Sequence, residues 1–495
     1  MKYLFATFIF LMSNQSIAQA NLDIALPEMG DSAGALVSPV EEYQVGQSFY
    51  WSLQQSVTLV DDPEVNSYIN SLGHRLVTNS DDPGRSFTFF VVPDNSVNAF
   101  AAPGGFIGIH TGLMLTSEAE SELASVMAHE IAHVTQRHIL RNFERSKRMS
   151  IPMTAAMIAA ALLGVADPSA GSAAIMAVQA GNVQMQLDYS RAHEAEADNL
   201  GMQTLVNAGF DPNAMPRFFE RLQIAGRFYG GNQIPEFLRT HPITVSRIAD
   251  ARGRAANLEP RPQIRDTKKF YLMREKVRVM TSANLRELIK TYEDKLKENT
   301  TEDQSVTRYG YALALLKNSN YTQARDEIND LIDLDDNQLS YHLVLADIEI
   351  ALGRMDAALA IYNDFQRVYP DDWALSIKQV QALLRANEPR KAITILQRQL
   401  DVGESSADLY RLLAKAYGDM GQKSKSHVWL AEHYHSSGQL MQAADQLRIA
   451  ADYARGDEFE LAKISSRLRQ VETDIAMMED CLLYTSDAAD DLLCV

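Results

Sequence analysis

Hydrophobic residues in the first quarter of the chain follow two different periods. After Asp62-Pro63, apolar residues recur every three or four positions, which predicts a helix over residues 63–76. Residues 87–92 and 106–110 are short runs rich in Phe, Val and Ile, and they predict two strands. We therefore expect a small sheet in this part of the chain.

A long helix is expected to follow the second strand. Ser117, with Glu120 three residues later, has the pattern of a capping box, so the helix should begin there and run at least to Phe143. Two almost wholly apolar runs come next, over residues 151–166 and 173–180. They are short for membrane spans. A lid-like helical hairpin and ordinary core packing are both open interpretations, with contact at a membrane surface as a weaker third.

The chain changes character beyond about residue 270, where helical periodicity is continuous. Small residues recur every 34 positions in two series: Ala324, Ala358, Ala392 and Ser426, then Ala312, Ala346, Val380 and Ala414. This period is the signature of tetratricopeptide repeats, and Gly353, Pro370 and Gly421 lie where such repeats turn. We expect the repeats to bind a partner protein on a concave surface. The alternative is that they only stabilise or space the rest of the chain.

Both ends of the chain differ from its middle. Lys2, a short apolar run and a small-x-small sequence ending at Ala20 predict a cleaved secretory signal peptide over residues 1–20. Residues 481–495 resemble a translated sequencing-library adapter. We therefore expect the natural protein to be exported and the last segment to be an artefact.

Composition narrows the possible functions. With 495 residues and 46% hydrophobic content, the chain can bury two or three domain cores. Its formal net charge of −18 makes nucleic acid an unexpected partner. The two cysteines, Cys481 and Cys494, both lie in the adapter-like segment. No disulfide framework or thiolate metal site is therefore expected elsewhere.

The main chemical signal is the pentapeptide His129-Glu130-Ile131-Ala132-His133. Residues four apart lie on one face of a helix, so the two histidines can bind one metal ion. A bound zinc ion lowers the pKa of its water from about 15.7 to about 7, and a nearby carboxylate can take the proton as water attacks a peptide carbonyl. The motif predicts a zinc endopeptidase with His129 and His133 as ligands and Glu130 as general base.

A catalytic zinc ion needs a third protein ligand. Candidates lie within residues 189–198, where His193, Glu194 and Glu196 are too close in sequence to face one metal together. Spacing favours Glu194, because Asp198 lies one turn further along the same face and can hold a ligand imidazole by its second ring nitrogen. Glu196 is expected to point away into solvent.

Four other residues have weaker claims. In one unbroken helix, His138 would lie on the face opposite to His129, which favours a structural role. His110 ends a predicted strand and has no spacing argument. His241 and Arg247 are interpreted as surface residues on spacing alone, although the polar loop of His241 could reach the metal.

These motifs resemble those of the HtpX-like and CAAX-prenyl-protease-like zinc peptidases, which combine His-Glu-x-x-His with a later Glu-x-x-Ala-Asp. The corresponding residues are His129–His133 and Glu194–Asp198. Further matching segments occur in the same order ahead of the repeats: residues 98–100, 124–138 and 240–242. The resemblance covers about residues 25–480 and supports Glu194 as the third ligand of one zinc ion per chain, with Asp198 assisting catalysis.

The resemblance implies a mainly α fold. A signal peptide over residues 1–20 would precede an α+β zincin-like metallopeptidase domain with a small sheet over 21–270. An all-α tetratricopeptide-repeat solenoid would follow over 271–480, ahead of the adapter-like segment 481–495.

The resemblance also implies roles that spacing does not. It places His241 at the zinc, as a fourth ligand or plug that keeps the peptidase silent. It implies a periplasmic enzyme that degrades unfolded or misassembled outer-membrane β-barrel proteins, whose repeats dock onto the β-barrel assembly machinery. We expect an edge strand over residues 105–110 to pair with extended substrate, and at most peripheral membrane association.

A non-enzymatic alternative remains open. In it the repeats act as a chaperone or scaffold for outer-membrane protein assembly, and zinc is structural. Glu130 argues against this alternative, because a purely structural zinc site needs no base.

Overall fold

The computed structural model describes residues 38–142, 190–228, 236–258, 267–298 and 304–488. The predicted signal peptide and the apolar runs over 151–166 and 173–180 lie outside these ranges. Among the helices that are described, none has the length and apolar character needed to cross a membrane.

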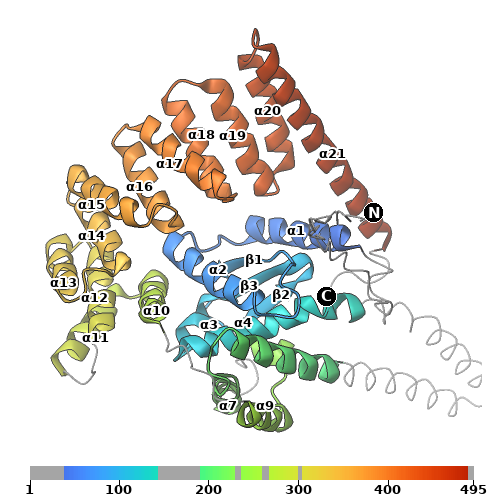
Figure 1. Cartoon of the computed structure of the whole chain (residues 1–495), viewed down its shortest axis with the longest axis vertical. Helices are drawn as coiled ribbons and strands as arrows, with labels where there is room; N and C mark the ends of the chain where they lie inside the picture. Colours follow the sequence, from blue (N-terminus) through green and yellow to red (C-terminus); the bar gives the residue numbers. More distant parts are fainter. Residues whose placement is uncertain (1–37, 143–189, 229–235, 259–266, 299–303, 489–495) are drawn as a thin grey trace, which may run out of the picture.

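The chain is mostly helical, with one small sheet near its N-terminus (Figure 1). The elements before the repeats are α1 (Pro39–Ser56), α2 (Pro63–Val77), β1 (Thr88–Val92), β2 (Ala99–Ala102), the 3-10 turn η1 (Pro103–Gly105), β3 (Phe106–His110), α3 (Thr111–Thr116), α4 (Glu120–Thr135), a helix over residues 190–207, α7 (Ala214–Phe228), α8 (Glu236–Thr240) and α9 (Val245–Asn257). The predictions of a helix after Asp62-Pro63 and of strands near residues 87–92 and 106–110 are confirmed. Asp62 begins α2 because its carboxylate accepts the backbone N–H groups of Glu64 and Val65, each at 3.0 Å.

The sheet has the strand order β1-β3-β2, with β1 parallel and β2 antiparallel to β3. The expectation that residues 105–110 form an edge strand is therefore wrong, because β3 lies in the middle. The sequence analysis missed β2, whose four residues precede the Pro-Gly-Gly turn of η1 and show no strand period. β2 is the edge strand beside α4.

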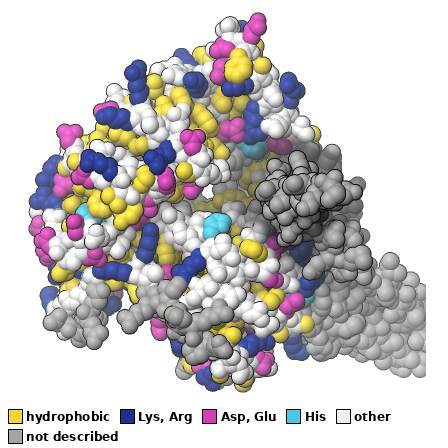
Figure 2. Space-filling view, in the orientation of Figure 1, with side chains coloured by type: hydrophobic (Ala, Val, Ile, Leu, Met, Phe, Trp, Pro, Cys, Tyr) yellow, Lys and Arg dark blue, Asp and Glu magenta, His cyan; other side chains and the backbone are white. Residues whose placement is uncertain are grey.

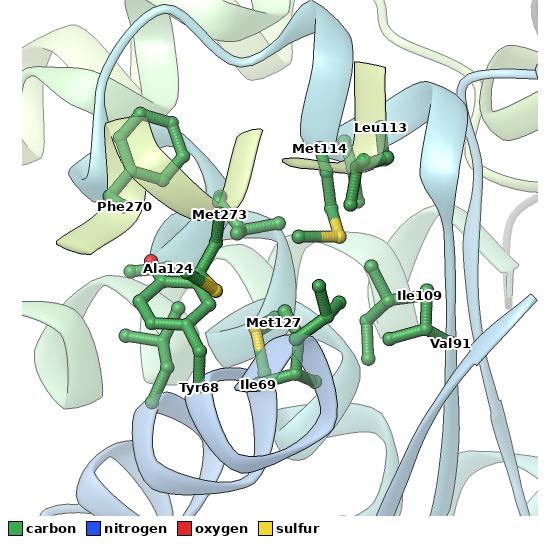
Figure 3. Packing of buried hydrophobic residues seen from close by; sticks show 14 of the residues in the cluster. Tyr68, Ile69, Val91, Ile109, Leu113, Met114, Ala124, Met127, Phe270 and Met273 are labelled. Carbon is green, nitrogen blue, oxygen red and sulfur yellow. The ribbon is translucent and has the colours of Figure 1, made fainter. Parts of the chain in front are cut away.

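A hydrophobic core lies between this sheet and the helices α2, α4 and α10 (Lys268–Thr281) (Figure 3). Met127 on α4, Ile69 on α2 and Ile109 on β3 are completely buried, and Met273 brings α10 into the same core. The helix that carries the pentapeptide is thus fixed on several sides, which is what a precise site requires.

Helix α4 differs from the prediction at both ends. Ala119, not Ser117, is its N-cap, because the Ser117 hydroxyl donates to the carbonyl of Leu113 at 2.9 Å. The Glu120 carboxylate instead accepts hydrogen bonds from Tyr68 and Thr267, each at 2.9 Å. The predicted capping box is therefore wrong.

The C-terminal end of α4 also comes earlier than expected. The helix ends at Thr135, well before Phe143, and Arg137 follows with a φ of +53°. A non-glycine residue with this backbone conformation stops an α-helix. Helical turns resume over residues 138–142 in a new direction.

The rest of the chain is a series of paired helices, as predicted. They are α11 (Leu285–Glu298), α12 (Ser305–Lys317), α13 (Tyr321–Leu334), α14 (Leu339–Ala351), α15 (Met355–Val368), α16 (Trp373–Arg385), α17 (Pro389–Asp401), α18 (Ala407–Asp419), α19 (Lys423–Ser436), α20 (Leu440–Tyr453) and α21 (Glu458–Ala488). Every residue of the two 34-residue series is buried except half-buried Ser426, whose hydroxyl donates to the Ala414 carbonyl at 2.7 Å. Gly353 and Gly421 turn with φ values of +78° and +73°.

The repeats arch over α1 and α2 and contact the N-terminal part at several places, including α16 against α2 (Figure 1). Lys276 of α10 is buried and lies 3.1 Å from the carboxylate of Asp62. Trp51 of α1 donates its indole N–H to the Ser436 carbonyl of α19 at 3.1 Å. Figure 2 shows the molecule hollowed between the repeats and the N-terminal part, where a cavity of about 1000 Å³ is lined by aromatic and acidic residues such as Tyr50 and Asp408.

Candidate metal centre

The candidate site lies where α4 crosses the helix over residues 190–207. Gly201 makes this close crossing possible, because a Cβ atom there would lie 3.0 Å from the backbone nitrogen of His129. His129 and Glu130 are completely or almost completely buried. The two motifs that are separated in sequence thus face each other across a helix contact without intervening side chains.

Four side chains converge on one point: His129, His133, Glu194 and His241. His129 Nε2 lies 3.0 Å from His133 Nε2 and 3.5 Å from Glu194 Oε2. His241 Nδ1 lies 3.4 Å from His129 Nε2 and 3.0 Å from Glu194 Oε1, and His133 Nε2 lies 3.4 Å from that same oxygen.

These distances can be compared with those of a tetrahedral metal site. Ligand atoms about 2.0–2.1 Å from a zinc ion are roughly 3.3 Å apart. The five separations just given, 3.0 to 3.5 Å, are close to that value, and the four ligand atoms all lie within 4.8 Å of one another. Three imidazoles and one carboxylate are also ligands that zinc accepts. The donor set therefore fits a zinc ion.

His129 is oriented by a second carboxylate. Its Nδ1 lies 3.0 Å from Asp198 Oδ1, while its Nε2 faces the cluster. Burial alone would raise the pKa of Asp198, but hydrogen bonds from Arg247 and His129 outweigh it and lower that pKa to about 2. Asp198 thus stays ionised and fixes the imidazole ring, as carboxylates beside metal-binding histidines do.

Arg247 is the second partner of the Asp198 carboxylate, contrary to its interpretation as a surface charge. It is only 8% exposed, and its guanidinium donates two hydrogen bonds of 2.7 Å to the Asp198 carboxylate. A third nitrogen lies 2.8 Å from Glu194 Oε2. The prediction that Arg247 lies on the surface is wrong. Its position near the start of α9 does not indicate which other helix packs against that turn.

His133 is held by a residue that sequence spacing placed elsewhere. The break at Arg137 turns the chain back, so that His138 Nδ1 lies 2.9 Å from His133 Nδ1. The prediction that His138 lies on the opposite face is wrong, because it assumed an unbroken helix. Glu196 does not point freely into solvent either, since its carboxylate lies 3.1 Å from His138 Nε2.

Glu130 lies between the cluster and the edge of the sheet. Its carboxylate accepts a hydrogen bond from the backbone N–H of Ala101 on β2. His241 Nε2 lies 3.5 Å from its Oε1. Burial raises the pKa of the Glu130 carboxyl above its ordinary value. A carboxylate with a raised pKa in a buried cleft is suited to receive a proton.

The cluster also distributes charge unevenly. Burial opposes the charged form of His129, but hydrogen bonds to Asp198 and Glu194 outweigh it and raise its pKa to about 10. Burial lowers the pKa of His133 to about 3. Contacts with the histidines hold the pKa of Glu194 far below its usual range despite burial. Without metal, the cluster therefore retains a proton that a metal ion must displace.

His241 reaches the cluster from a short loop. Its backbone N–H donates to the Phe237 carbonyl at 2.7 Å, and the two rings stack with centroids 4.9 Å apart. Phe237 in turn donates its N–H to the carbonyl of Val97, just before β2. The loop therefore lies along the same strand edge that Glu130 contacts.

The structure thus brings together the predicted residues of the two motifs and His241, and it separates His110. His110 Nδ1 instead lies 2.8 Å from the Ser96 hydroxyl. Arg247 and His138 are the residues that sequence reasoning missed. No pattern in the sequence pairs Arg247 with Asp198. The position of His138 depends on the positive φ of Arg137, which the sequence does not indicate.

Comparison with known proteins gives independent information. Residues 63–255 match the model of Peptidase family M48, and residues 309–372 match a tetratricopeptide repeat model. The chain is 33% identical to the beta-barrel assembly-enhancing protease of Escherichia coli (strain K12), over 95% of this chain and 96% of that protein. It is 35% identical to a putative beta-barrel assembly-enhancing protease of Vibrio cholerae, over 83% and 84%. The mitochondrial metalloendopeptidase OMA1 of Schizosaccharomyces pombe is 30% identical over 37% of this chain and 50% of its own length.

Proposed function

The chain belongs to the family of β-barrel assembly-enhancing proteases, and from that premise we propose that it uses one zinc ion to cleave unfolded or misassembled outer-membrane β-barrel proteins in the periplasm. Its class, a metalloendopeptidase with tetratricopeptide repeats, follows from the family. The observation that carries the proposal is the cluster of three histidines and Glu194, with the buried Glu130 carboxylate beside it.

In this proposal His129, His133 and Glu194 hold the zinc ion. A bound zinc ion supplies an activated water and polarises the peptide carbonyl. The Glu130 carboxylate would accept the proton of the attacking water and pass it to the leaving amine, for which its raised pKa is favourable. Asp198 keeps the His129 ring in place throughout.

Substrate binding is proposed at the outer edge of β2. The Ala101 N–H group points at Glu130 and not at β3, so the outer edge of β2 runs past the site. An extended segment can pair with such an edge through backbone hydrogen bonds. This mode suits unfolded strands of a β-barrel, because it reads the backbone more than the side chains.

His241 is proposed to block this arrangement. Its Nδ1 takes the fourth corner of the cluster, and its loop occupies the Val97 carbonyl at the start of the strand edge. Substitution His241→Ala should raise basal proteolysis of an unfolded substrate and weaken zinc binding slightly. If both quantities remain at the wild-type value, His241 is not a plug.

The test of the mechanism is Glu130→Gln, assayed against a misassembled barrel protein. Cleavage should fall by about 10² to 10⁴-fold, the contribution typical of a general base, while zinc and substrate binding persist. Glu118→Gln is the matched control, because Glu118 is exposed and pairs only with Arg221 among the contacts seen. A Glu130→Gln protein that cleaves as fast as this control would overturn the mechanism.

A chaperone or scaffold function is the second candidate. It is supported by the cavity of about 1000 Å³ between the repeats and the N-terminal part, which is separate from the metal cluster. We propose that the repeats contact the β-barrel assembly machinery. If Glu130→Gln restores barrel assembly in cells as well as the wild type does, the non-proteolytic function is the main one.

A further inference from the structure

Glu42 of α1 is a buried carboxylate outside the proposed metal site. It is 3% exposed, and its two oxygens pair with different arginines. Oε1 lies 3.0 Å from Arg85 Nη1, and Oε2 lies 3.1 Å from Arg137 Nε. The backbone N–H of Gly104 adds a longer contact at 3.4 Å. Burying a carboxylate with two charged partners costs desolvation free energy. The elements that these ion pairs connect are therefore of interest.

Both arginines act on the end of the metal-site helix. Arg85 donates from Nη1 to the carbonyl of Val134, in the last turn of α4, at 3.3 Å. Arg137 is the residue at which α4 stops, and its backbone N–H also donates to Val134 at 2.9 Å. Glu42 therefore connects α1 to the point where the helix ends.

The backbone at this point is strained. Arg137 has a φ of +53°, a conformation that is unfavourable for a non-glycine residue. It persists only where surrounding contacts enforce it. The ion pair between the Arg137 side chain and Glu42 is such a contact, because it fixes the side chain on the α1 side of the turn.

The strained turn has one direct consequence at the site. It reverses the chain so that His138 Nδ1 lies 2.9 Å from His133 Nδ1. His133 points its other nitrogen, Nε2, into the four-residue cluster. A hydrogen bond at one imidazole nitrogen fixes the orientation of the other, and losing it typically weakens metal binding 10- to 100-fold.

We propose that Glu42 is a positioning residue for the metal centre: by clamping Arg137 it holds the turn that places His138 against His133. The inference rests on the proposed function in so far as His133 binds zinc. A purely structural role, in which Glu42 only fastens α1 to the sheet, is the competing explanation. The two differ in whether the effect of Glu42 passes through His138.

A double-mutant cycle on the full-length protein distinguishes them. Zinc dissociation constants are measured by competition with a chromophoric chelator for wild type, Glu42→Gln, His138→Ala and the double variant. We expect about tenfold weaker binding for each single variant, and a double variant no weaker than His138→Ala. Additive losses, or unchanged affinity in Glu42→Gln, would overturn the proposal.

Spectroscopy supplies a readout that does not depend on activity. In cobalt-substituted protein, the visible absorption of the metal reports the geometry of its ligands. Glu42→Gln should shift this spectrum in the same direction as His138→Ala. A spectrum identical to that of the wild type would contradict the proposal even if the variant were less stable.

Two further variants keep the test decisive. Glu41→Gln is the matched control, because Glu41 is exposed, lies next to Glu42 and bonds to Ser38, a contact that Gln can also make. Arg137→Ala replaces the first variant if Glu42→Gln does not fold, since alanine keeps the strained positive φ but has no side chain that reaches Glu42. It should lose zinc affinity about as His138→Ala does. If the wild-type protein binds no zinc, the proposed function fails. If the wild-type protein binds zinc and the variants bind it equally well, only this inference fails.

Discussion

The close crossing at Gly201 allows a sharp test of how the site is built. Glycine inside a helix is normally unfavourable, so Gly→Ala in an open position stabilises a protein by about 0.5–1 kcal/mol. At Gly201 the new Cβ would lie 3.0 Å from the His129 nitrogen and 3.1 Å from the Ala128 carbonyl oxygen. These are backbone atoms that cannot rotate away, so the two helices must separate.

The magnitude follows from a matched control. Gly253 lies within α9, and an added Cβ there would meet nothing within 4 Å. Gly253→Ala should therefore show only the stabilisation expected when alanine replaces glycine inside a helix. Gly201→Ala should lie about 1–3 kcal/mol below it in the free energy of unfolding, which is the usual cost of overpacking.

The site should respond as well as the stability. Separation of the helices moves Glu194 and Asp198 away from His129, so zinc affinity should fall at least tenfold in Gly201→Ala and stay unchanged in Gly253→Ala. Denaturant titration and chelator competition measure the two quantities. Equal stabilisation by both alanines, with equal zinc affinity, would refute the argument that this helix contact positions the ligands.

Three more predictions concern charge and metal. Arg247→Met leaves the buried Asp198 carboxylate without its arginine partner and should cost about 3–5 kcal/mol in denaturant unfolding. A loss below 1 kcal/mol would contradict the buried pairing. Partial desolvation and the neighbouring Asp408 raise the pKa of Asp61 from 3.8 to about 6. The stability that its protonated form contributes is therefore fully present below about pH 4 and is lost as the pH rises through 6. Asp61→Asn should thus melt higher than wild type at pH 7.5 but not at pH 4, and an equal difference at both values would be inconsistent with this. Exhaustive chelation should abolish cleavage. Zinc added at about 100 times its Kd should restore cleavage and raise the free energy of unfolding by about 2.7 kcal/mol. Cleavage that survives chelation would exclude a metal mechanism.

The features that sequence predicted well are local ones. The helix after Asp62, the strands β1 and β3 and the repeats all follow from periodic patterns whose cause lies within a few residues. The mainly α fold with one small sheet is confirmed. The four residues of β2 gave no such pattern, because this strand is specified by its pairing with β3.

The site shows the same division. The spacing within each motif brought its residues onto one helix face, but the contacts between motifs depend on Gly201 and on tertiary packing. Arg247 was misread for this reason. His138 was misplaced because a strained backbone at Arg137 has no sequence signature. The domain boundaries and the nature of residues 481–495 remain predictions, although α21 continues to Ala488.

The contacts between the repeats and the N-terminal part, which include α16 packed on α2, change how the repeat array should unfold. In an open solenoid each repeat touches only its neighbours, so a terminal repeat can fray alone. Here Lys276 fastens the first helices to Asp62, and Trp51 fastens α19 through Ser436, with Gly438 packed against the indole ring. The repeat array is thereby attached to the N-terminal part at more than one place along its length. The helices between these anchors should therefore unfold as one cooperative unit, whereas α20 and α21, which follow the contact at α19, can fray separately.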